Sequence, residues 1–211
     1  MALDRPVTDV DDTRPTVAAL DLYWIPLGAG NRTVQFSGRT YESIAARLDR
    51  RPPCHLYHSA LVATLGGDRY FIEMTPVPSA SHAVADRGVV GGGAVGTNWA
   101  QRLRIFRYEI RCWRNGIIPD LHHAVGGPVD LTHDESRIRA ALEAVPSVPT
   151  PTWGRDELGA GEMWNSNSVI AWVLGVTGLH PHAGVPPAPG RAPGWDAGIT
   201  VAGRVRTLAD Q

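Results

Sequence analysis

The spacing of apolar and polar positions predicts β-strands in the first half of the chain. Residues 16–26 form an apolar run that ends at a proline. Residues 55–65 and 69–75 are strand-like and flank Gly66-Gly67-Asp68, which is a strong hairpin signal. Residues 102–113 alternate strictly between apolar and polar positions. The pattern therefore predicts a meander of antiparallel strands.

Segments in which the apolar residues have helical spacing lie mainly in the second half of the chain. Residues 37–51 are amphipathic and are stopped by two prolines, and residues 134–145 form a second helix that Asp134 caps. A third helix begins at Asn165 and continues through an apolar run to residue 174. Strands that meander and helices that cluster near the end of the chain indicate the α+β class.

The remaining segments predict loops and a single domain. Residues 1–15 are polar and acidic and predict a disordered arm, followed by one domain over 16–211. The Gly- and Ser-rich stretch 77–97 predicts a long loop. Its segment 91–96 matches G-x-G-x-x-G, but it lacks a convincing preceding strand and a later acidic partner. The segment therefore predicts a mobile loop, for which an active-site lid is one candidate role, and not a dinucleotide site. Residues 199–202 predict a short edge strand.

Composition excludes several functions. The chain has 211 residues, of which 43% are hydrophobic, and 20 basic residues stand against 21 acidic ones. Because the charges nearly balance, the chain has no positive electrostatic field that would attract nucleic acid. Every basic residue is arginine, which removes Schiff-base chemistry, a pyridoxal phosphate lysine and a Walker lysine. No cofactor is expected. Cys54 and His58 lack a second ligand pair, so no metal site is expected either.

Targeting features point to the cytoplasm. The N-terminus has no basic-then-apolar layout of a secretory signal. No apolar run reaches the roughly 18 to 20 residues that a transmembrane helix needs. Cys54 and Cys112 form no disulfide framework and are expected to be reduced. The sequence therefore predicts a cytoplasmic protein without a transmembrane segment.

Ser166 is the first candidate for chemistry. It lies between Asn165 and Asn167 at a helix start, where free N–H groups and the helix dipole favour negative charge. A nucleophile and an oxyanion site both benefit from that position. The alternative is that these residues are simply helix caps, and Ser168 is a rival reactive hydroxyl.

His58 and Glu73 are the candidates for the base and its orienting acid. His58 lies in an otherwise apolar or small stretch of strand, and Glu73 is a carboxylate in an apolar strand. A two-residue turn at Gly66-Gly67 pairs Ala60 with Glu73 and makes His58 its diagonal neighbour on the same face. The alternatives are a structural histidine, and a salt bridge between Glu73 and an arginine of the 102–114 strand.

The order of these pieces resembles a known superfamily. A strand with His58-Ser59-Ala60-Leu61, a glycine-turn hairpin and a later Asn-nucleophile-Asn-Ser helix start are similar to the circularly permuted papain-like proteins related to NlpC/P60. The resemblance covers residues 58–174. It implies a papain-like core with an antiparallel sheet packed against the nucleophile helix, His58 as base, Ser166 at the position of the usual cysteine, and Glu73 as the third polar residue.

The resemblance implies acyl transfer or hydrolysis of an amide or ester, on a small-molecule or acyl/peptidyl substrate. Asn165, Trp164 and Asn167 would then line the substrate site. The departure is the hydroxyl of Ser166, since a serine needs far more activation than a cysteine. Ser166 is therefore compatible with three interpretations: a Ser-His-Glu hydrolase, a natural inactive variant, or an engineered Cys→Ser replacement. A non-catalytic binding module on the same fold and a biosynthetic acyl-transfer or cyclisation enzyme are the other candidates.

Overall fold

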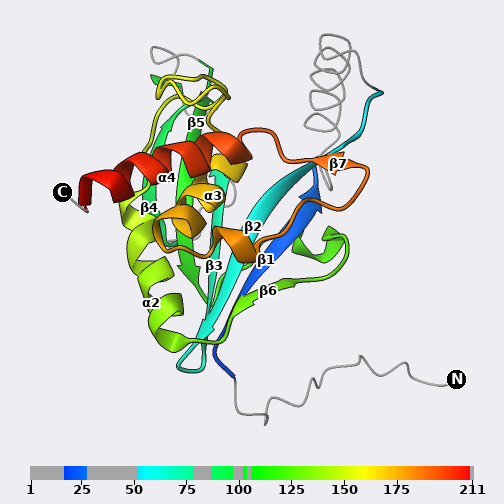
Figure 1. Ribbon diagram of the computed structural model, residues 1–211, viewed down its shortest axis with the longest axis vertical. Coiled ribbons are helices and arrows are strands. Elements are labelled where there is room, and N and C mark those ends of the chain that lie inside the picture. Colours follow the sequence, from blue (N-terminus) through cyan, green and yellow to red (C-terminus); the bar gives the residue numbers. More distant parts are fainter. Residues whose placement is uncertain (1–16, 28–51, 78–86, 97–101, 104–105, 210–211) are drawn as a thin grey trace, which may run out of the picture.

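A computed structural model describes residues 17–27, 52–77, 87–96, 102–103 and 106–209. Within these ranges the chain forms one mixed α+β unit, in which a twisted sheet carries helices on one face (Figure 1). The predicted arm over 1–15 and the predicted helix over 37–51 lie outside the described residues. No helix in the described ranges is both long and apolar enough to cross a bilayer.

The sheet has seven strands, and its main path runs β4-β5-β3-β2-β1-β6. All neighbours on this path are antiparallel, and a short β7 joins β2 in parallel. The strands are β1 Ala19–Pro26, β2 His55–Leu65, β3 Asp68–Pro76, β4 Val89–Ala94, β5 Arg107–Arg114, β6 Val129–Thr132 and β7 Gly190–Arg191.

The β2–β3 hairpin has the predicted two-residue turn. Leu65 pairs with Asp68, and Gly66 and Gly67 between them have φ of 60° and 87°. Positive φ at both central positions defines a type I′ turn, whose twist matches that of the flanking strands. This turn fixes the register in which Leu61 pairs with Ile72. Glu73 and the even-numbered residues of β2 therefore lie on the same face of the sheet.

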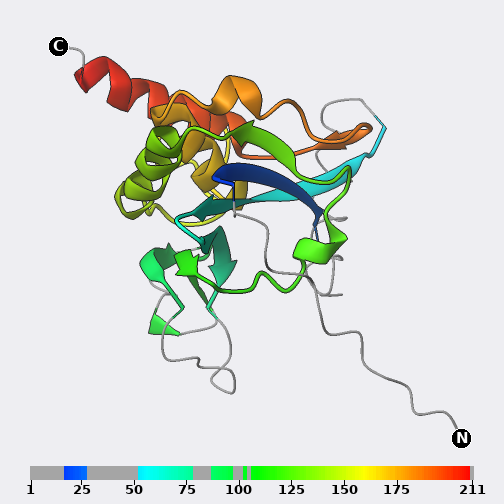
Figure 2. The same ribbon diagram turned by 90° about the horizontal axis from the view of Figure 1, so that it is seen from below.

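Three α-helices in the described chain cover one face of the sheet: α2 Glu135–Ala144, α3 Ser166–Val176 and α4 Trp195–Ala209 (Figure 2). Asp134 caps α2 as expected, because its carboxylate accepts from the N–H groups of Ser136 and Arg137. Short 3₁₀ turns occur at Leu121–His123 (η4), Val145–Ser147 (η5) and His180–His182 (η6). The helices bury the odd-numbered side chains of β2, such as Leu61 and Ala63, in the main core.

The prediction of an edge strand over 199–202 is wrong, because these residues belong to α4. α4 lies against α3 at very short range. A Cβ added to Gly198 would collide with the backbone of Ser168 and the side chain of Ala171, and one added to Gly175 would meet the Cβ of Ala202. The small residues therefore serve helix packing, and the short apolar run is the buried stripe of a helix rather than a strand.

The opposite face of the sheet is only partly covered among the described residues. A second, smaller apolar cluster lies there and consists of Ile25, Ala60, Val62, Phe71 and Ile118. The segment from Ile118 through η4 packs on it with Leu121 and Ala124. The rest of this face carries charged side chains from β3 and β5, which form the network described below.

The prediction of one long loop over 77–97 is also wrong in its second half. Residues 89–94 form β4, which pairs with β5 although three of its residues are glycines. The ring of Tyr108 lies so close to Gly93 that a Cβ there would collide with it. The pairing and the covering aromatic ring compensate for low strand propensity, so the glycine run is a strand edge and not a lid.

Candidate functional site

β2 and β3 separate at the end of their hairpin that lies away from the Gly66-Gly67 turn. The start of α3 lies where the two strands separate. Their pairing ends at Leu61 and Ile72. Beyond that point β2 stays with β1 as far as Tyr57, while β3 stays with β5 as far as Pro76. The carbonyl of Leu56 accepts from the N–H of Leu27, the residue directly after β1. The carbonyl of Tyr57 therefore points away from β1, toward the space between the separated strands.

Asn167 of α3 fills this space. Its Nδ2 donates to the carbonyls of Tyr57 at 3.0 Å and Pro193 at 2.9 Å, and its Oδ1 accepts from Ser59 Oγ at 2.9 Å. The amide thus replaces the missing neighbouring strand and joins β2, α3 and the loop before α4. We call Asn167 and its three partners, Ser59, Tyr57 and Pro193, the Asn167 interlock. A buried polar group must be hydrogen-bonded, and Asn167 meets that requirement with both ends of its amide.

The other polar residues at the helix start form a complete capping box. Asn165 Oδ1 accepts from the backbone N–H groups of Asn167 and Ser168, and Ser168 Oγ accepts from the N–H of Asn165. Ser168 also donates to the carbonyl of Gly194 at 2.7 Å. Two of the N–H groups that an oxyanion would require are therefore already occupied by the Asn165 side chain.

Ser166 is different from its neighbours. Its side chain makes no hydrogen bond to any described residue, although only 7% of the residue is exposed. It occupies the first position of α3, with the positive end of the helix dipole beneath it. Among the four polar residues at this helix start, Ser166 alone has a hydroxyl or amide that the described structure leaves without a hydrogen bond.

His58 lies on the other face of the sheet. Its Nε2 is 3.0 Å from Oδ2 of Asp120, the residue that precedes η4. Successive side chains of a strand point to opposite faces, and Ser59 points toward α3. Burial acts to raise the pKa of Asp120, but the hydrogen bond and charge of His58 outweigh it and lower that pKa below its ordinary value. His58 and Asp120 form a dyad that is partly exposed.

The three residues expected to form a triad are consequently not assembled in this structure. His58 and Glu73 do share a face, as the hairpin register predicts, yet His58 is bonded to Asp120. Ser166 starts a helix on the opposite face. The residue of β2 that meets the helix start is Ser59, and its partner is Asn167. No described histidine is hydrogen-bonded to Ser166.

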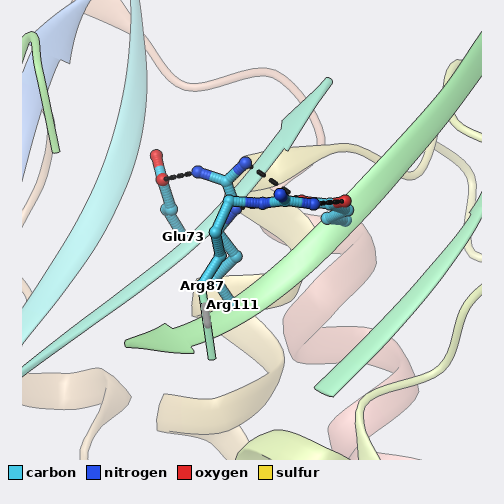
Figure 3. A network of polar contacts seen from close by, with 4 residues as sticks. Glu73, Arg87 and Arg111 are labelled. Carbon is cyan, nitrogen blue, oxygen red and sulfur yellow. Dashed lines mark hydrogen bonds and ion pairs between the residues drawn. The ribbon is translucent and has the colours of Figure 1, made fainter. Parts of the chain in front are cut away.

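Glu73 belongs to a chain of alternating charges on β3, β5 and the residues before β4 (Figure 3). Arg111 donates to Glu73 at 3.2 Å and to Glu109 at 3.0 Å, and Arg87 donates to the other oxygen of Glu109 at 2.7 Å. The expected alternative for Glu73, a salt bridge to an arginine of the 102–114 strand, is confirmed. We call Glu73, Arg111, Glu109 and Arg87 the charge ladder.

The two carboxylates of the ladder have opposite pKa shifts. Burial raises the pKa of Glu73, and the attraction of Arg111 offsets only part of that effect, with the charge of Asp120 adding to the increase. Burial also opposes ionisation of Glu109, but hydrogen bonds from Arg87 and Arg111 overcome it and lower its pKa. Glu109 is therefore the firmly charged member, and Glu73 is the one that takes up a proton first.

The tryptophans near the helix start are core residues. Trp164 is 1% exposed and Trp172 is 4% exposed. Trp24 packs on Trp195 with ring centroids 4.9 Å apart. The indole N–H groups of Trp24, Trp164 and Trp172 are buried without an acceptor in the described chain. Of the expected substrate-binding residues, Asn165 caps the helix, Asn167 holds the interlock, and Trp164 packs in the core.

Sequence reasoning missed three residues of this region. Asp120 follows a proline in a turn, and no local pattern indicates that this turn folds back onto β2. A serine in a strand has no distinctive signal, so the sequence does not single out Ser59. Arg111 was available as one of several arginines in an alternating strand, and the cross-strand register with Glu73 is what singles it out.

Among the residues that the structure describes, no group of three or more histidine, cysteine or acidic side chains is arranged to hold a metal ion. Comparisons with known proteins add no identification: no family model, no curated protein and no solved structure matches this chain.

Proposed function

We propose that this chain is a non-catalytic ligand-binding protein on an α+β frame of the permuted papain-like kind. In this proposal the start of α3 is a structural joint and does not act as a nucleophile. The observation that carries it is the Ser59–Asn167 hydrogen bond of 2.9 Å, which occupies the point where a strand residue meets the helix start. A base would have to stand there for Ser166 to be activated.

Two further features support a structural role for the helix start. The Asn165 side chain already accepts from the N–H groups that would otherwise hold an oxyanion. His58 is engaged by Asp120 on the far face of the sheet. A serine hydroxyl without a base is almost fully protonated and is a poor nucleophile at neutral pH. Hydrolysis through Ser166 would require β2 or α3 to rearrange.

The second candidate is the serine-dependent acyl hydrolase or acyltransferase that acts on an amide or ester. One observation favours it: the hydroxyl of Ser166, at the positive end of a helix, has no hydrogen bond to any residue that the structure describes. Such a position suits a nucleophile. Carrier-linked thioesters would be the substrates if the reaction were biosynthetic acyl transfer or cyclisation.

Covalent labelling separates the two candidates. Folded protein is incubated with a fluorophosphonate probe, with a known serine hydrolase in the same mixture as a positive control, and the intact mass is measured. The binding-protein proposal expects no adduct on Ser166 and no turnover of an activated ester or an acyl thioester. An adduct that disappears in both Ser166→Ala and His58→Ala would overturn the proposal and establish the hydrolase. Identical behaviour of wild type and Ser166→Ala supports it.

A further inference from the structure

A surface hollow lies next to the charge ladder, at the outer edge of the sheet. Its volume is about 420 Å³, and it is lined by side chains and backbone from the end of β3, from β4, from the start of β5 and from the segment before it: Val77, Val89, Gly91, Gly92, Arg102, Arg107 and Glu109. This volume falls within the range of roughly 300 to 1,000 Å³ that small-molecule sites occupy. The hollow is distinct from the Asn167 interlock, which lies on the helix side of the sheet.

The charges around the hollow do not cancel. Glu109 is the one acidic residue among the described residues that line it, and Arg87 and Arg111 hold both oxygens of that carboxylate. The ladder as a whole pairs two arginines with two glutamates and is neutral. Arg102 and Arg107 also line the hollow, and neither forms an ion pair with any described residue. Two positive charges therefore remain for a ligand.

Glycines in the wall of the hollow leave space for a ligand. Gly91 and Gly92 present backbone without side chains, and the β4–β5 register shifts between Val89 and Gly91. Register shifts of this kind re-aim side chains and are common beside functional sites. On the other side, the N–H of Val77 donates to the carbonyl of Arg107 at 2.9 Å, which fixes the backbone of that arginine. The valines at positions 77 and 89 add an apolar portion to the lining.

From this combination we infer that the hollow binds a small molecule with a carboxylate or phosphate group and a short apolar portion. The guanidinium groups of Arg102 and Arg107 hold the anionic group, since arginine matches the geometry of both oxyanions. Val77 and Val89 contact the apolar portion. Glu109 takes no part as a counter-ion because the ladder has already neutralised it. The inference rests on the proposed binding function and specifies the ligand class.

Calorimetric titration with three probes tests the inference. Hexanoate carries the anion and an apolar chain, hexanol carries the chain alone, and inorganic phosphate carries the anion alone. We expect hexanoate to bind more tightly than hexanol, and its affinity to fall as salt is added. We expect Arg107→Gln and Arg102→Gln each to lower the affinity for hexanoate about ten-fold. The control is Arg114→Gln, which removes an exposed arginine of the same strand outside the hollow and should leave the affinity unchanged.

Phosphate distinguishes the two anion types: phosphate binding that exceeds hexanoate binding and depends on Arg107 assigns the site to phosphate compounds. Equal affinity for hexanol and hexanoate would overturn the inference, as would equal effects of Arg107→Gln and Arg114→Gln, or no binding of any probe. None of these failures bears on labelling of Ser166, so the proposed function is judged separately by the fluorophosphonate experiment.

Discussion

His58 and Ser59 are consecutive in the sequence but serve opposite faces of the sheet, because His58 is bonded to Asp120 while Ser59 is bonded to Asn167. His58 therefore lies on the same face as the charge ladder, and the β2 side chain at the start of α3 is the hydroxyl of Ser59. A one-residue shift of the β2 register would exchange the two. The hairpin turn at Gly66-Gly67 and the pairing with β1 exclude that shift.

The Asn167 interlock predicts unequal effects of neighbouring substitutions. Asn167→Ala leaves the hydroxyl of Ser59 and the carbonyl of Tyr57 without their partner, whereas the carbonyl of Pro193 still accepts from Nδ2 of Asn165 at 2.8 Å. Unpaired buried polar groups are costly, so we expect a loss of about 3 kcal/mol in the free energy of unfolding, measured by urea denaturation. Ser166→Ala removes no hydrogen bond and is the matched control, with an expected change within about 0.5 kcal/mol. Equal effects would contradict the structural role.

The His58–Asp120 dyad predicts a pH-dependent contribution to stability. The pKa of Asp120 is lower in the folded protein than its ordinary value of 3.8. A lowered carboxyl pKa stabilises the folded state above the unfolded value, and this stabilisation is lost as the pH falls through the folded value. Asp120→Asn should therefore cost about 1 kcal/mol at pH 6, because the pair is partly exposed and modest in strength, and this cost should shrink as the pH falls below 3.8 through the lowered folded pKa. A cost independent of pH would contradict this account.

The charge ladder predicts that its central arginine is essential to stability. Arg111→Met leaves Glu73 unpaired in a buried position, and we expect a loss of about 3 kcal/mol at neutral pH. Burial already raises the pKa of Glu73, and loss of Arg111 raises it further. The folded state then favours protonated Glu73, so the cost should shrink as the pH is lowered toward the ordinary value of 4.5.

Arg114→Met is the control for the ladder. Arg114 lies on the same strand and pairs with Asp68, but its side chain is 66% exposed. An exposed ion pair contributes little to stability because water and salt screen it, and its removal should show little dependence on pH near neutrality. Chemical denaturation over a pH series measures both variants. The ladder account fails if the two arginine substitutions cost the same.

The contact between α3 and α4 predicts opposite effects of two glycine substitutions in one helix. Gly198→Ala places a methyl group against the backbone of Ser168, so we expect a loss of about 2 kcal/mol from overpacking. Gly203→Ala meets nothing within 4 Å and should stabilise the helix by about 0.5 to 1 kcal/mol. Thermal unfolding of the two variants gives the comparison. A gain for both would mean that the helices do not approach so closely.

Local patterns predicted the hairpin, the Asp134-capped helix and the helix that starts at Ser166, because turn chemistry and capping depend on residues close in sequence. They failed for β4, whose glycines have low strand propensity and whose pairing depends on β5. They also failed for α4, where a short apolar run fitted two periods equally well.

The candidate site was predictable only in part. The register that places His58 and Glu73 on one face follows from the turn. The face on which α3 packs does not, because both faces of β2 carry apolar side chains: Leu61 and Ala63 on one, Ala60 and Val62 on the other. The partner of His58 comes from a turn 62 positions away, and no periodicity in the sequence indicates that contact.

The Asn167 interlock also bears on how the chain folds. Asn167 and Tyr57 are 110 positions apart, so their hydrogen bond closes a large loop whose entropy must be lost before the contact can form. The β2–β3 hairpin needs no such closure and can form first. We therefore expect the interlock to form late in folding and to slow unfolding, so its loss should shorten the lifetime of the native state while leaving the folding rate nearly unchanged.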